Sequence, residues 1–199
     1  AITLNGGTLD LAGKAVDNAI ALEGAAIIKG GAKYTGDFSM GSGADLMKGS
    51  VVNIAAGKTV TLSGGAINGT LSGLGSIKVA GDVELGATGK LTTSALAVES
   101  GTFSIGSKGL ALSAKNSILT VNGGVVDSEG KLSTNELQMT GGEISIDTAK
   151  AMSLDIKGKT TSSLVDNGKI SVAGKMSVAG NLELAGAASI HLYDPSGNN

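Results

Sequence analysis

Two acidic residues, Asp82 and Glu84, are the pair in this sequence best placed for acid–base chemistry. They flank Val83, so in a strand their side chains project from the same face. Enzymes that cleave polysaccharides need clustered carboxylates of this kind. Outward carboxylates around a buried aliphatic residue also keep a sheet face soluble and protect it from edge pairing. We therefore interpret the pair as part of a solvated strand face, with polysaccharide cleavage as the alternative.

His191 is the only histidine in the chain. It occupies the outward position of Ile190-His191-Leu192 and stands near Asp194. A histidine beside an aspartate can transfer protons in catalysis, but no serine here lies in a recognisable nucleophile motif and there is no cysteine. We interpret His191 as a solvated residue close to the last strand.

Two short segments resemble the end of a phosphate-binding loop, Gly-x-x-x-x-Gly-Lys-Ser/Thr. These are Gly57-Lys58-Thr59 and Gly158-Lys159-Thr160, but Val52 and Ser153 stand where the first glycine is needed. No helix is predicted after either segment, so both are interpreted as turns. The Gly-Gly pairs also lack the Gly-Gly-x-Gly-x-Asp pattern of calcium-binding repeats. The sequence predicts no catalytic residue, no cofactor and no metal ion.

The composition narrows the class of function further. Without cysteine there is no disulfide, no thiolate metal site and no cysteine nucleophile. The 15 basic residues are all lysines, and the formal net charge is -2. Arginine is the residue that grips phosphates and reads guanine edges, so we predict no nucleic-acid partner. No run approaches the roughly 20 apolar residues of a membrane-spanning helix.

Short strands are the elements that must position these residues. An apolar residue, a polar or small residue and a second apolar residue recur from end to end, which is the period-two pattern of strands with one buried face. Examples are Ile2-Thr3-Leu4, Val60-Thr61-Leu62, Ile77-Lys78-Val79, Phe103-Ser104-Ile105, Leu137-Gln138-Met139 and Leu182-Glu183-Leu184. Glycines between the strands, many in pairs such as Gly64-Gly65, predict tight turns.

The spacing of the strands predicts a solenoid. Neighbouring triplets often start six or seven residues apart, as at Ile77 and Val83, so three strand-and-turn units make a coil of roughly 18 to 22 residues. Aromatic residues form only 2% of the chain, whereas wide sandwich and barrel cores use them as anchors. We predict an all-β fold, a single-stranded parallel β-helix in which residues 1–199 form one domain. Because the chain starts at Ala1, we expect a processed chain or a fragment of a longer protein.

Two stretches depart from the strand rhythm. Residues 30–50 hold one of the two tyrosines, one of the two phenylalanines and two methionines, which predicts a lateral loop excursion. Tyr34, Phe38, Met40 and Met47 are therefore the predicted partner contacts. Residues 157–168 are polar and rich in serine and threonine, which is typical of a loop rather than a buried rung.

Glycine-punctuated segments give the chain a family resemblance. Gly-Gly-Glu-Ile-Ser-Ile (141–146), Gly-Lys-Ile-Ser-Val-Ala-Gly (168–174) and Gly-Asn-Leu-Glu-Leu-Ala-Gly (180–186) resemble the passenger regions of Gram-negative autotransporters and filamentous-haemagglutinin-type exoproteins. The likeness covers nearly the whole chain and lies in the style of the repeat. It implies a right-handed β-helix stalk that is exported and serves in adhesion, aggregation or toxin display. The chain departs from those proteins in having no Arg-Gly-Asp tripeptide.

These observations predict a non-catalytic, extracellular structural or adhesive module that mediates surface attachment or self-association. The expected partner is a host or cell-surface protein, a glycan, or another copy of the chain. One alternative is a polysaccharide lyase or hydrolase of the β-helix type. Another is a self-polymerising scaffold, such as a bactofilin-like filament or a surface layer, in which rungs stack end to end.

Overall fold

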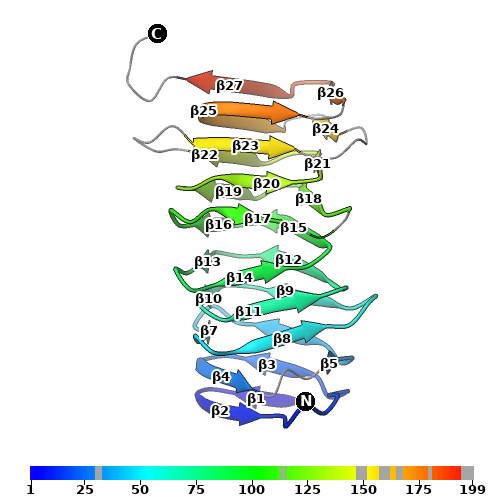
Figure 1. Cartoon of the computed structure of the whole chain (residues 1–199), viewed down its shortest axis with the longest axis vertical. Coiled ribbons are helices and arrows are strands. Elements are labelled where there is room, and N and C mark those ends of the chain that lie inside the picture. The colour runs from blue at the N-terminus through cyan, green and yellow to red at the C-terminus, as the bar shows by residue number, and fades with distance from the viewer. Residues whose placement is uncertain are drawn as a thin grey trace.

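The protein is an all-β solenoid in which parallel strands stack along one axis. The computed structural model spans residues 1–199 and describes residues 1–29, 33–112, 114, 116–146, 152–156, 162–164, 168–178 and 181–193. Within these residues there is no helix, and each coil contains about 20 residues. The rungs succeed one another from β1 and β2 at one end to β26 and β27 at the other (Figure 1). The predicted parallel β-solenoid is confirmed.

Three faces form the wall of the solenoid. The first face is a ten-stranded sheet made of β1 (Ile2–Leu4), β3 (Ile20–Leu22), β6 (Phe38–Met40), β9 (Thr59–Leu62), β12 (Ser76–Ala80), β15 (Ala95–Ser100), β18 (Ile118–Val121), β21 (Glu136–Met139), β24 (Ser162–Leu164) and β26 (Leu182–Leu184). The second face is made of β2 (Gly7–Asp10), β4 (Ala25–Lys29), β7 (Asp45–Leu46), β10 (Gly65–Ile67), β13 (Val83–Leu85), β16 (Thr102–Ile105), β19 (Val125–Ser128), β22 (Glu143–Ile146), the first part of β25 (Lys169–Val178) and β27 (Ser189–Tyr193).

The third face consists of two separate ladders. One contains β5 (Lys33–Tyr34), β8 (Val51–Ile54), β11 (Thr70–Gly73) and β14 (Lys90–Thr92). The other contains β17 (Leu110–Ala111), β20 (Leu132–Thr134), β23 (Met152–Ile156) and the second part of β25. Strand β25 pairs with β22 and with β23, so it passes from the second face to the third.

The register keeps like residues above one another. Partners on the first face lie 17 residues apart at Thr59 and Ser76 and 25 apart at Gln138 and Ser163, so coil length varies while the pairing stays in phase. One inward column contains Leu4, Leu22, Met40, Leu62, Val79, Val98, Val121, Met139, Leu164 and Leu184. A strand alternates its side chains between two faces, so this column fills the interior while its neighbours meet solvent.

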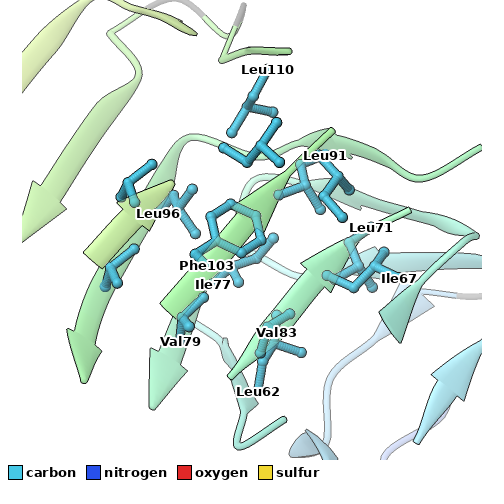
Figure 2. Close-up of a cluster of buried hydrophobic side chains, with 14 of the residues drawn as sticks. Leu62, Ile67, Leu71, Ile77, Val79, Val83, Leu91, Leu96, Phe103 and Leu110 are labelled. Atoms are coloured by element: carbon cyan, nitrogen blue, oxygen red, sulfur yellow. The ribbon is translucent and has the colours of Figure 1, made fainter. Parts of the chain in front are cut away.

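The core is narrow and aliphatic. Phe103 is the largest fully buried side chain, and it lies among Ile77, Val79, Val83 and Leu96 in Figure 2. These five residues come from strands of the first and second faces. Dense packing of this kind makes an interior stiff and intolerant of lost volume.

Glycine is required at the corner between the first and second faces. Gly101 has a φ of 69°, and a Cβ atom added to it would lie 2.4 Å from the backbone of Gly81 on the preceding coil. Both the left-handed backbone and the close approach exclude a side chain there.

The structure corrects the expected excursion over residues 30–50. β6 pairs with β3 and β9, and β7 pairs with β4 and β10, so both are ordinary rungs. Phe38 and Met40 are 2% and 1% exposed, because the larger side chains fill the core instead of leaving it. The loop expected over residues 157–168 likewise contains a rung, β24, whose Ser162 and Leu164 are buried.

Candidate binding cleft

The third face is interrupted between β14 and β17. These strands lie on successive rungs of the near side in Figure 1, but no pairing joins them among the described strands. On the first face the strands of the same two coils, β12 and β15, pair over most of their length. The interruption is therefore local to one wall of the solenoid.

The hydrogen bonds at the interruption show which backbone groups face it. Lys90 donates its N–H to the carbonyl of Gly69 on the preceding coil. Leu110 and Leu112 donate theirs to carbonyls of the following coil, on Lys131 and Ser133. The hydrogen bonds of these residues therefore lie on the side of each strand that faces away from the interruption.

Successive residues of a parallel strand direct their N–H and C=O groups to opposite neighbours. Leu91, between Lys90 and Thr92, and Ala111, between Leu110 and Leu112, therefore turn their backbone groups toward each other's strand. The described pairing supplies no strand partner on that side for either residue. The result is two sheet edges that face one another.

Two adjoining cavities mark the space between these edges. One, of about 290 Å³, lies along the third face and is lined by Leu91, Leu110 and Ala111 among others. The other, of about 320 Å³, lies at the corner with the second face. Both are lined by Leu85 and Gly109, so they form one continuous depression, which we call the cleft.

The floor of the cleft is formed by aliphatic side chains of the core. Leu85 and Leu110 are each 5% exposed, and their register partners Ile67 and Leu132 are 0% exposed. In Figure 2, Leu110 lies above Leu91 and away from the tight cluster around Phe103. The cleft therefore offers an apolar surface between two polar edges.

The turns before β14 and β17 pack against different coils, which accounts for the missing pairing between these two strands. A Cβ atom on Gly89 would lie 2.1 Å from the Ile67 carbonyl of the preceding coil, and one on Gly109 would lie 2.0 Å from the Lys131 carbonyl of the following coil. A Cβ atom on Gly106 would have nothing within 4 Å. The two turns are thus packed tightly against opposite halves of the stack, with open space between them.

Charged side chains surround the corner of the cleft. Glu84, Lys108 and Glu129 all line the larger cavity and are exposed. The Lys108 Nζ donates a hydrogen bond to the carbonyl oxygen of Ala87, so this side chain bridges the two turns. Lys90 lines the other cavity on the third face. The charged side chains therefore gather at the corner end of the cleft, where two carboxylates and two lysines stand.

The two acidic residues that the sequence singles out have different settings. The Asp82 Oδ1 accepts a hydrogen bond from the Thr102 N–H at 2.9 Å, so Asp82 contacts the next coil. Glu84 points outward from β13 and lines the same cavity as Glu129, whereas Asp82 lines neither cavity. Sequence reasoning found Glu84 but missed Glu129, Lys108, Leu91 and Ala111.

The turns beside the cleft do not stand out in the sequence, because the same tight turn recurs at residues 41–44 and 55–58. The corner turns read Gly86-Ala87-Thr88-Gly89 and Gly106-Ser107-Lys108-Gly109, twenty residues apart. Gly89 and Gly109 donate to Gly86 and Gly106 at 2.9 and 2.8 Å, so both segments form the same tight turn. Recognising that they diverge in space requires the coordinates.

The histidine and the two phosphate-loop-like segments that the sequence analysis considered can also be placed in the fold or outside its described part. His191 is exposed on β27, in register with Ser171, while Asp194 lies outside the described residues. Lys58 donates its N–H to the Ala55 carbonyl at 3.1 Å in a tight turn, and β9 follows instead of a helix. The segment 158–160 lies outside the described residues.

The four predicted partner contacts do not form one surface. Phe38 and Met40 are core residues, so their assignment as partner contacts is wrong. Met47 is 39% exposed and stays a prediction. The side chain of Tyr34 lies outside the described part of the structure.

No group of three or more metal-ligating side chains occurs among the described residues. Nor does any helix in the described part of the chain have the length and apolar character to cross a membrane. Comparisons with protein families, curated proteins and solved structures found no match to this chain.

Proposed function

We propose that the protein is a non-catalytic, extracellular structural and adhesive module. The observation that carries the proposal is the inward column from Leu4 to Leu184, which runs through all ten strands of the first face. A solenoid with one continuous aliphatic core transmits force along its axis and displays its lateral surface at a fixed spacing. These are the properties of a stalk or spacer that attaches surfaces to one another.

Self-association is one way in which such a module acts. Leu74 is 76% exposed at a corner of the third face. Exposed aliphatic side chains favour contact with another apolar surface. A scaffold whose rungs stack end to end is the alternative form of self-association.

Polysaccharide cleavage is the second candidate function. The observation that favours it is that Glu84, Glu129 and Lys108 line one cavity, because glycosidic cleavage needs paired carboxylates beside the scissile bond. All three are exposed, and the aromatic content of the chain is 2%, which leaves few platforms for sugar stacking. The adhesive proposal is therefore preferred.

An adhesion assay tests the two candidates together. Beads coated with the wild-type protein are mixed with cultured cells and with one another, and acidic polysaccharides are incubated with the same protein. We expect attachment or clumping, no cleavage products, and less than about a twofold change in adhesion for Glu84→Gln/Glu129→Gln, because exposed charges contribute little.

The matched control is Asp127→Asn, which removes an exposed carboxylate from β19 outside the two cavities. Beads that neither attach nor clump would contradict the proposal. Cleavage products that disappear in the double variant and persist in the control would establish the enzyme instead.

A further inference from the structure

We propose that the cleft binds an extended polypeptide segment, which inserts between β14 and β17 as an additional parallel strand of the third face. This inference deepens the proposed function, and it rests on the premise that the module acts by binding a partner. It assigns that partner a chemical class and a binding mode.

Backbone complementarity identifies the class of ligand. Leu91 directs its N–H and C=O into the cleft from one side, and Ala111 does so from the other. An extended peptide carries donors and acceptors along both of its edges, so one strand satisfies both sets at once. A glycan has hydroxyl groups but not this alternating spacing along two opposite edges.

The floor determines the side chain that the peptide must bring. Leu85, Leu91 and Leu110 line the cavities, and a strand turns alternate side chains inward. One aliphatic side chain therefore points at the floor, and its neighbours point outward. The flanking strands span three and two residues, so pairing extends over about three residues of the ligand.

The corner of the cleft holds charges of both signs. The chain on the third face runs from the corner turn at Gly89 toward Thr92, so a parallel peptide places its N-terminal side at the corner. Glu84 and Glu129 stand there, while Lys108 is engaged with the Ala87 carbonyl. Lys90, next to Gly89, also lines the cleft at this end, so the peptide needs no charged residue before its aliphatic residue.

The chain itself contains segments that form a short strand with one inward aliphatic residue. Gly89-Lys90-Leu91 and Gly130-Lys131-Leu132 both place a lysine before the inward leucine of a third-face rung. A peptide that copies such a rung is therefore a suitable probe. We choose the acetylated and amidated segment 88–94, Thr-Gly-Lys-Leu-Thr-Thr-Ser.

The test follows backbone amides of the full-length protein by NMR. In the free protein we expect the amides of Leu91 and Ala111 to exchange with solvent at least about tenfold faster than those of Leu71 and Leu132, which lie within paired ladders. Addition of the peptide should slow both amides and shift their resonances. A peptide with aspartate in place of its leucine should do neither.

Two variants test the geometry separately. Ala111→Pro removes the N–H that faces the cleft without deleting a hydrogen bond of the ladder, because proline is tolerated at strand edges. This variant should bind the peptide at least about tenfold more weakly. The control variant Ala111→Ser keeps the N–H and should bind the peptide like wild type. Gly106→Phe sends a side chain into open space beside the corner cavity and should weaken binding similarly. The second variant covers the case in which the proline variant fails to fold.

Three outcomes would overturn the inference. Protected Leu91 and Ala111 amides in the free protein would mean that the two ladders close on each other. Peptide-induced shifts elsewhere, or none, would mean that the cleft is not a strand site. Shifts at the cleft with an oligosaccharide but not with the peptide would assign the cleft to a glycan. In each case continued bead adhesion would leave the proposed function standing, so the two failures are distinguishable.

Discussion

The first and third faces of the solenoid are built from the same kind of short rung, yet only the first is paired without interruption. On the first face β12 joins β15 from Ser76 to Ala80, with one register shift, and the inward column passes through it. On the third face the same two coils contribute β14 and β17, which lie in different ladders. The first face therefore joins the two coils by strand pairing, and the third face does not.

The difference teaches that a solenoid coil need not be closed on every side. Because each coil contacts only its neighbours, the loss of one set of strand pairs is tolerated where the other two faces keep their pairing. On the second face β13 pairs with β16 beside the cleft. The same two coils are thus joined by paired strands on both of the other faces.

The largest expected effect comes from removing core volume on each wall. Leu119→Ala, on the closed first face, should lower the free energy of unfolding by about 2–5 kcal/mol, because Leu119 is 0% exposed and its cavity has no way to fill. Leu110→Ala should cost less, about 1–2 kcal/mol, because Leu110 lines the cleft and the space left by its side chain would open into it. Urea denaturation followed by circular dichroism measures both. Equal losses would contradict the distinction between the walls.

An intermediate effect is expected from adding a methyl group to two corner glycines. Gly101→Ala should destabilise the protein by about 1–3 kcal/mol, because the φ of 69° and the contact with Gly81 both oppose a Cβ atom. Gly106→Ala should change stability by less than about 0.5 kcal/mol, because nothing lies within 4 Å of its added Cβ atom. Thermal denaturation of the two variants gives the comparison. A comparable loss at Gly106 would show that the corner is closed.

The smallest expected effect concerns two lysines. Lys131→Met removes an ion pair with Asp155, whose side chain is 19% exposed, inside the closed β20–β23 ladder, and should cost up to about 1 kcal/mol. Lys108→Met removes the contact with Ala87 across the cleft and should cost less than about 0.5 kcal/mol. Thermal midpoints measured in parallel decide the order. A larger loss for Lys108→Met would mean that this lysine is what keeps the two halves of the third face together.

Much of the fold could be predicted because its cause is local. In triplets such as Ile77-Lys78-Val79 the alternation of apolar and polar residues indicates which face is buried. Glycines such as Gly101 occur at corners where no side chain fits. The misreading of Phe38 and Met40 has a physical reason as well. Large side chains in a sequence poor in aromatics suggest a binding surface, but here two larger residues fill the interior of their rung.

The candidate site could be predicted only in part. Glu84 was visible as an outward carboxylate, but its relation to Glu129 depends on two coils being stacked with a particular offset. Ala111 gave no signal, because its importance lies in a backbone N–H whose partner strand is missing. Hydrogen-bond partners of this kind are set by the pairing of distant segments, which no local pattern encodes.

The sequence by itself determined that short aliphatic strands and glycine turns would wind into a parallel solenoid with about 20 residues in each coil, since period-two burial and tight turns depend on neighbouring residues. Only the tertiary structure decided which neighbouring coils pair on the third face and which do not. This depends on the turns at Gly89 and Gly109, which pack against different coils. Contacts between coils determine whether the strands of a face pair, and the missing pairing places the cleft between β14 and β17.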